Sequence, residues 1–311
     1  MGKNRYNSCF SRVSMRIFIY ILLFFVTNTV CKHLTGDFSE NKLLTPSSAN
    51  SSWSQIEGNQ IDLSTFDQKY RYLGKGKQAH VFISEDGEHV LKLFRQFSPL
   101  ISINFFGKSV ILSISKIPFA SFLFSFFWQK EGIEKRQLDF ISYVNSFNLL
   151  KKETRLEYLH LAKTDCLKRK IHLYDKIGVL HQIDLDSTCF LVQKKTDLLY
   201  PTLTSLLKQK KEEEAKKLLE KFALLCLQLT KKGIINPTTI EQNYGYLQGD
   251  PILIDVGRVL TKDDLQQEVK PPIEQIYHTA HHMKKWLQIK DPLLCQYFEK
   301  ILTTYANENA L

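Results

Sequence analysis

The chain lacks closely spaced cysteines. Its cysteines are widely spread and form no Cys-x-x-Cys pair or zinc-finger spacing: Cys9, Cys31, Cys166, Cys189, Cys226 and Cys295. Cys189 and Cys226 fall within apolar patterns, so we expect them to be buried free thiols. Such thiols argue against a long residence in an oxidising compartment.

The chain also lacks the aromatic strand of an RNA-reading module. It carries 42 Lys and Arg against 32 Asp and Glu, a formal charge of +10, which favours attraction to anionic surfaces such as membrane phospholipid. The lysines are scattered, which is typical of solvated helix faces, so we expect no sequence-specific nucleic-acid partner. His278, His281 and His282 have helical spacing but no companion cysteine or carboxylate, and we interpret them as a polar helix surface.

No apolar run reaches the roughly twenty residues that a membrane-spanning helix requires. Residues 17–26 are apolar, however, and follow the basic residues Lys3, Arg5, Arg12 and Arg16. This order is typical of a signal peptide or a short N-terminal membrane anchor, which we assign to residues 1–31. The polar stretch 45–52 then indicates a flexible linker over residues 32–65. The sequence therefore predicts a membrane-associated or exported protein.

A second apolar segment, 98–128, is rich in aromatic and branched residues but is interrupted by Gly107, Lys108, Lys116 and Pro118. It is interpreted either as an interfacial hairpin or helix that meets lipid, or as an insertion packed onto the neighbouring lobe. The N-terminal apolar segment favours a location near a membrane.

A glycine-rich turn precedes a strand lysine. Gly74, Gly76 and the small residue Ala79 would let the backbone approach phosphate oxygens, and Val81 would cover one face of an adenine ring. Lys92 lies one strand later, after a Glu85-Asp86-Gly87 turn, where its ammonium could reach phosphates. Residues 70–95 are therefore predicted to form three short strands. A β-hairpin with ordinary turn glycines is the alternative.

A second hairpin is predicted over residues 246–258, with a Gln-Gly-Asp-Pro turn and an apolar strand that ends in Asp255-Val256-Gly257. Asn243 precedes this hairpin. Carboxylate and amide oxygens are suited to the hard cation Mg²⁺. Asp255 and Asn243 are thus candidate metal ligands.

Together these segments resemble the protein-kinase-like superfamily, whose signature runs Gly-x-Gly-x-x-Gly-x-Val, then a strand lysine, then Asp-Phe-Gly. The resemblance covers about residues 66–260 and is nearest to small bacterial kinase-like proteins, such as lipopolysaccharide-core sugar kinases. It implies that ATP and Mg²⁺ are bound, with Lys92 on the phosphates and Asn243 and Asp255 on the metal. It also implies that Glu134, or alternatively Glu131, pairs with Lys92 from a helix over residues 131–149.

The catalytic loop departs from this family. Where kinases carry an aspartate five residues before the asparagine, this chain has Thr238, and no aspartate occurs between Asp197 and Asp250. A threonine cannot accept a proton at neutral pH. Two interpretations follow: an enzyme that transfers the γ-phosphoryl of ATP to a protein, lipid or sugar hydroxyl, or an inactive pseudokinase that acts as a membrane-associated interaction protein.

We therefore expect an α+β, two-lobed protein-kinase-like fold with a hydrophobic insertion after the third strand. The first lobe would cover residues 66–195, with an interlobe hinge near 193–195, and a short second lobe would cover residues 196–311. Helices are expected over residues 212–232, 272–287 and 291–305. A membrane-attached structural protein with chance motifs is a third possibility. Export would also separate the domain from cytosolic ATP.

Overall fold

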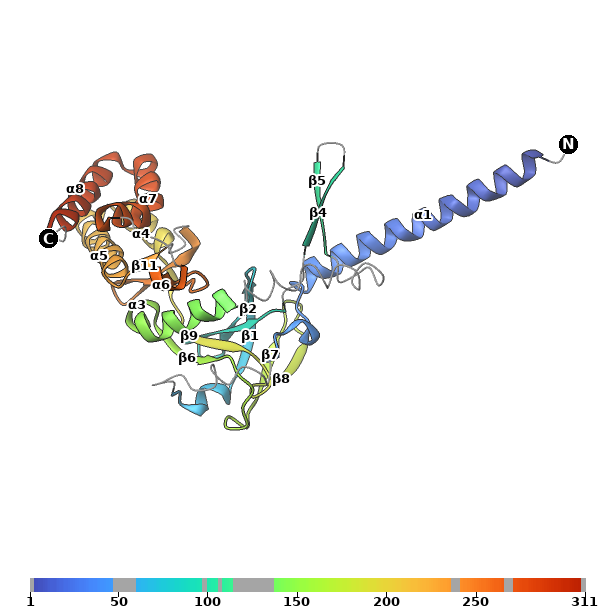
Figure 1. The fold of residues 1–311 in the computed structure, drawn as a ribbon, viewed down its shortest axis with the longest axis horizontal. Helices are drawn as coiled ribbons and strands as arrows, with labels where there is room; N and C mark the ends of the chain where they lie inside the picture. Colours follow the sequence, from blue (N-terminus) through green and yellow to red (C-terminus); the bar gives the residue numbers. More distant parts are fainter. Residues whose placement is uncertain are drawn as a thin grey trace.

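The computed structural model describes residues 3–46, 60–96, 100–105, 108–113, 137–235, 241–265 and 271–308. The protein is a mixed α+β chain, as expected. Figure 1 shows helix α1 (Lys3–Leu34) extending away from a central sheet, while the C-terminal helices gather at the other end of the molecule. Within the described ranges, no helix combines the length and apolar character needed to cross a bilayer.

The main sheet has seven strands in the order β6-β9-β3-β2-β1-β7-β8. Neighbouring strands run antiparallel except for β1 and β7, which pair in parallel. The strands are β1 (Lys69–Lys75), β2 (Ala79–Ser84), β3 (His89–Phe94), β6 (Leu156–His160), β7 (Lys170–Tyr174), β8 (Leu180–Asp184) and β9 (Phe190–Lys194). The three strands predicted over residues 70–95 are confirmed.

The two faces of this sheet carry different cores. Because side chains alternate along a strand, Leu91 and Leu93 of β3 face a cluster that includes Phe82 and Phe190. Phe94 faces the opposite side, where Tyr143 stacks on it at a centroid distance of 4.3 Å. Tyr143 belongs to the helix at residues 137–149, which is the described part of the helix predicted over residues 131–149. Lys92 lies on this helix-covered side of β3.

The second half of the chain is mainly helical, with the helices packed around one apolar cluster. They are α4 (Leu199–Lys208), α5 (Glu212–Lys231), α7 (Pro272–Lys290) and α8 (Pro292–Glu308). Two short helices lie elsewhere in the chain: α6 (Lys262–Leu265) precedes α7, and α3 (Lys151–Thr154) follows helix 137–149. The predicted helices over 212–232, 272–287 and 291–305 are thus confirmed within a few residues. Phe222 of α5 lies at the centre of the cluster, in contact with Tyr244 and Phe298.

Short strands complete this half. β12 (Tyr244–Leu247) and β13 (Asp250–Leu253) form the predicted hairpin, joined by Gln248 and Gly249, whose φ values of 51° and 88° give the left-handed turn that such hairpins favour. β10 (Asp197–Leu198) pairs with β12, and β11 (Ile234–Ile235) pairs with β14 (Leu260–Thr261).

Two parts of the region predicted as a flexible linker, 32–65, pack on the sheet. After α1, Phe38 and Leu43 join the core, and Leu44 exchanges backbone hydrogen bonds with Phe94 and Cys189. This stretch contains the short 3₁₀ helix η1 (Glu40–Lys42), and a second one, η3 (Leu63–Phe66), buries Phe66. Residues 47–59 lie outside the described ranges. Of the insertion predicted over 98–128, the structure describes a hairpin of β4 (Leu100–Phe105) and β5 (Lys108–Ser113).

Candidate functional site

Lys92 connects the two halves of the molecule. Its Nζ donates a hydrogen bond of 2.5 Å to the backbone carbonyl of Ile254, the residue before Asp255. Burial lowers the pKa of the Lys92 ammonium to about 8, and the Asp255 carboxylate partly opposes this effect. The structure therefore brings together the strand lysine and the acidic segment that the sequence singled out, although 162 residues separate the bonded pair.

Asn243 and Asp255 lie at the same end of the β12–β13 hairpin. The register pairs Tyr244 with Leu253, and the next pair outward is linked by a 2.8 Å bond from the Ile254 N–H to the Asn243 carbonyl. Asn243 is buried, whereas Asp255 is half-buried and accepts a 3.1 Å bond from the Gly257 N–H. The two predicted metal ligands thus lie at the same end of one hairpin, Asn243 before β12 and Asp255 after β13.

Helix 137–149 fastens the segment that follows Asp255. The Ser142 hydroxyl donates to the Val256 carbonyl and accepts from the Val259 N–H, both at 2.6 Å. Asn145 Nδ2 donates to the Val259 carbonyl at 3.2 Å and to Asp264 Oδ2 at 2.7 Å. This helix therefore fixes the position of Asp255 relative to the sheet.

Replacing Ser142 with alanine is expected to lower the free energy of unfolding by about 1–3 kcal/mol, because the buried Val259 N–H would lose its hydrogen-bond acceptor. Urea unfolding of the two proteins measures the difference. Ser146→Ala is the matched control, since Ser146 is equally buried but makes only a 3.4 Å contact with Val256 and bonds within its own helix. Equal losses for both variants would contradict the role of Ser142.

Gln78 connects the glycine-rich turn to helix 137–149 and lies close to Gly257, in the segment after Asp255. Gln78 Nε2 donates to Asp139 Oδ1 at 2.7 Å, and the Tyr143 hydroxyl donates to Gln78 Oε1 at 2.8 Å. A Cβ at Gly257 would lie 2.3 Å from Gln78 Oε1, so a larger residue there would have to displace the Gln78 side chain. Burial raises the pKa of Tyr143 well above its ordinary value, and the Asp139 and Asp255 carboxylates add to this. Gln78, Asp139 and Tyr143 therefore belong to the site, although sequence reasoning missed them.

The residues predicted to bind nucleotide lie along the edge of this site. Val81 is paired directly with Lys92, which puts the two side chains on the same face of the sheet. Ala79 is buried at the start of β2. A Cβ on Gly74 would meet no atom within 4 Å, and one on Gly76 would lie 3.9 Å from the Ala79 carbonyl. Neither glycine is required by packing, and the backbone at Gly74 borders open space.

Three residues singled out for the predicted kinase-like site lie outside the described ranges: Glu131, Glu134 and Thr238. Within the described helix 137–149, Asp139 is the single carboxylate in the sequence, and it contacts Gln78.

The described residues contain no group of three or more His, Cys, Asp or Glu side chains suited to hold a metal ion. Asn243 and Asp255 supply one amide and one carboxylate. Such a pair fits Mg²⁺, which usually keeps several waters and takes its remaining ligands from substrate phosphates.

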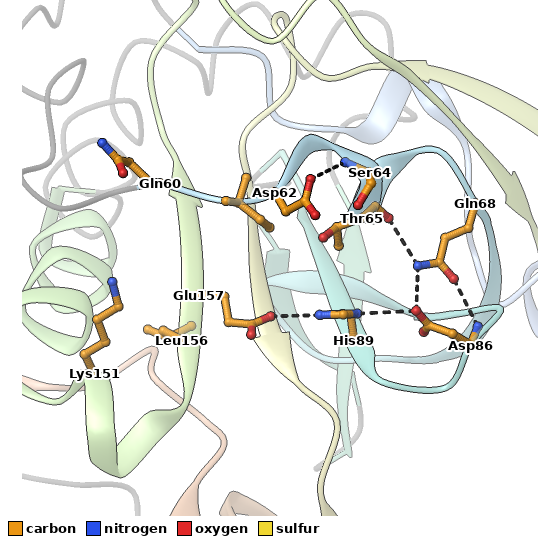
Figure 2. Close-up of a pocket in the computed structure, with 11 residues that line it drawn as sticks. Gln60, Asp62, Ser64, Thr65, Gln68, Asp86, His89, Lys151, Leu156 and Glu157 are labelled. Atoms are coloured by element: carbon orange, nitrogen blue, oxygen red, sulfur yellow. Dashed lines mark hydrogen bonds and ion pairs between the residues drawn. The ribbon is translucent and has the colours of Figure 1, made fainter.

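An open hollow of about 520 Å³ lies elsewhere, between η3, β3 and β6 (Figure 2). Four of its polar side chains form pairs: His89 Nε2 lies 3.2 Å from Glu157, and Gln68 bonds to Asp86 at 2.9 Å. Neither Lys92 nor Asp255 lines it. We therefore place the candidate site at the junction of Lys92 and Asp255, where residues capable of binding a charged ligand converge.

Comparison with known proteins did not identify a family for this chain. No family model matches the chain, and no curated protein resembles it closely enough to count as a match.

Proposed function

We propose that the protein is a kinase-like nucleotide-binding protein, which binds ATP with Mg²⁺ between Lys92 and Asp255. The observation that carries this proposal is the hydrogen bond from Lys92 Nζ to the Ile254 carbonyl, which places a cation from the sheet beside an acidic residue from the other half. In a two-lobed kinase-like fold, these are the groups that meet across the nucleotide cleft.

The chemistry of Lys92 supports an anionic ligand. Burial disfavours its charged form, and the hydrogen bond that its ammonium makes to the described residues goes to a neutral carbonyl, that of Ile254. An ammonium has three donors, so phosphate oxygens would supply further acceptors and further negative charge beside Lys92. Gly74 and Gly76 would leave space for the phosphates, and Val81 would contact the base.

Asn243 and Asp255 would hold Mg²⁺, which, when bound, neutralises charge on the phosphate oxygens. Their common attachment to the β12–β13 hairpin fixes the two oxygen donors relative to each other. Ser142 and Asn145 of helix 137–149 bind the segment after Asp255, which would keep the Asp255 carboxylate in a fixed position relative to Lys92. If the protein transfers a phosphoryl group, its acceptor would be a hydroxyl of a protein, lipid or sugar.

A pseudokinase is the second candidate, and the sequence favours it at one point. Thr238 stands where the family has its catalytic aspartate, and no aspartate lies between Asp197 and Asp250. Such a protein would bind nucleotide without using it and would act through a protein partner. A phosphate-transfer assay with γ-labelled ATP over panels of protein, lipid and sugar acceptors separates the two candidates. Transfer that is lost in Asp255→Asn identifies the enzyme.

Thermal unfolding with ATP and Mg²⁺ tests the proposed binding. A ligand at one hundred times its Kd stabilises the native state by about 2.7 kcal/mol, so the wild-type Tm should rise by several degrees. Asp255→Asn should lose the part of this rise that depends on Mg²⁺, because an amide binds the cation more weakly than a carboxylate. Asp165→Asn, at an exposed position of the sheet half, is the control and should respond like wild type.

A Tm unaffected by ATP and Mg²⁺ in the folded wild-type protein would contradict nucleotide binding. It would favour the third possibility, a membrane-attached structural protein in which the motifs occur by chance.

A further inference from the structure

Helix α1 presents a continuous apolar surface. Every residue from Phe18 to Val26 is exposed, with exposed fractions between 45% and 70%, and Val30 and Leu34 extend this surface toward the body of the protein. Figure 1 shows this helix standing clear of the sheet. An exposed apolar surface of this extent marks a site of interaction with another molecule or a membrane.

The turn between β7 and β8 adds a second exposed apolar surface at the base of α1. Ile177, Val179 and Leu180 have exposed fractions of 55%, 49% and 50%. This turn is tied to the end of α1, because Lys176 Nζ donates a 2.9 Å bond to the His33 carbonyl. The next strand is tied to the segment after α1 by a 2.9 Å contact between His181 Nδ1 and Glu40 Oε1. Two regions far apart in the sequence therefore form one surface.

The charges around this surface are mostly positive. Arg16 precedes the apolar stretch of α1, and Lys32 lies at its end. Lys176 lies in the turn, the exposed Lys75 ends β1, and the exposed Lys77 follows that strand. The nearest carboxylates already have cationic or histidine partners: Asp37 contacts Lys42, Arg95 and Lys75, while Glu40 and Asp175 both contact His181. An anionic ligand would therefore be attracted to this end of the molecule.

We infer that α1 and the β7–β8 turn together dock on an anionic lipid bilayer. The apolar residues of both elements would enter the boundary between headgroups and acyl chains, while Lys32 and Lys176 meet lipid phosphates. A second copy of the chain is a poorer occupant, because both copies would bring the same positive charge to the contact. This inference does not depend on nucleotide binding.

Co-sedimentation of the full chain with vesicles tests the inference. The protein should bind vesicles of phosphatidylcholine with phosphatidylglycerol at least about tenfold more strongly than vesicles of phosphatidylcholine alone. The double variant Ile177→Ser, Val179→Ser should bind the anionic vesicles about tenfold less strongly than wild type. The matched control is Ile289→Ser, Leu293→Ser, which removes apolar residues of 82% and 77% exposure from α7 and α8 and should bind like wild type.

Four results would overturn the inference. The turn double variant could bind like wild type, or the protein could show no preference for the anionic lipid. Alternatively, lipid-free protein could sediment as a stable dimer that Phe24→Asp disrupts, without any vesicle binding, which would assign the surface to a second copy. Mass spectrometry of the protein purified from cells completes the test, since a mature N-terminus beyond residue 34 would remove α1 from the surface.

Discussion

Replacing Lys92 with methionine is expected to stabilise the protein at pH 7 and to abolish its response to nucleotide. The pKa of Lys92 falls from 10.5 to about 8 in the folded state, which corresponds to about 3 kcal/mol. This value is an upper limit, because the side chain is only half-buried and also donates a hydrogen bond to Ile254. Methionine has a similar length and carries no charge, so it removes the cost of burying the ammonium.

The pH dependence of this effect has a definite sign. Below about pH 8 the lysine is protonated in both states, and the variant keeps its full advantage. Between about pH 8 and 10.5 the unfolded state binds more protons than the native state, so wild-type stability rises with pH and approaches that of the variant. Urea unfolding at pH 7, 9 and 10 measures this convergence.

Lys170→Met is the matched control, because Lys170 is an exposed lysine on β7 and its removal should change stability little. ATP and Mg²⁺ should still stabilise Lys170→Met but should not stabilise Lys92→Met. A Lys92→Met protein that is less stable at pH 7, or that still gains stability from ATP and Mg²⁺, would contradict the account of this lysine.

Replacing His80 with leucine is expected to remove a loss of stability at acid pH. His80 is fully buried in β2, its two ring nitrogens have no hydrogen-bond partner among the described residues, and Phe38 packs edge-on against it at 5.1 Å. Burial lowers the pKa of His80 to about 4, the nearby Arg95 lowers it further, and Asp37 opposes this. The native state therefore keeps the imidazole neutral.

The unfolded state binds a proton on His80 as the pH falls below 6.5, whereas the native state binds it only near pH 4. Native stability therefore decreases between these values, by at most about 3 kcal/mol. In His80→Leu this component should be absent. Because carboxylates titrate in the same range, the quantity to measure is the difference in unfolding free energy between variant and wild type at pH 7, 5.5 and 4.5.

His172→Leu provides the control, since His172 is exposed on β7. Its difference from wild type should be nearly constant with pH, while that of His80→Leu should grow as the pH falls. A difference in unfolding free energy that stays constant with pH for His80→Leu would mean that the native state protonates the buried imidazole as easily as the unfolded state does. This result would contradict the account of His80.

Local patterns in the sequence were sufficient for much of the fold. The strands around Lys92, the long helix α5 and the β12–β13 hairpin follow from apolar periodicity and from turn residues such as Gly87 and Gly249, whose φ values are positive. These features depend on neighbours in the chain, so the sequence alone predicts them.

The remaining features depend on contacts between distant residues. The addition of β7 beside β1, in parallel to it, and of β8 at the edge of the sheet has no local signal, because β1 and β7 are about a hundred residues apart. The same holds for the packing of residues 37–44 on the sheet, which a polar sequence after α1 does not indicate. Gln78 occupies a variable position of the glycine-rich turn, and its contacts with Asp139 and Tyr143 arise only when helix 137–149 is in place.

A crystal structure with a non-hydrolysable ATP analogue and Mg²⁺ tests the central claim most directly. We expect the phosphates within hydrogen-bond distance of Lys92 Nζ, and the cation on the oxygens of Asn243 and Asp255, with Gln78 displaced from Gly257. An analogue seated in the hollow beside His89 and Glu157, or a folded protein that binds none at saturating concentration, would contradict it.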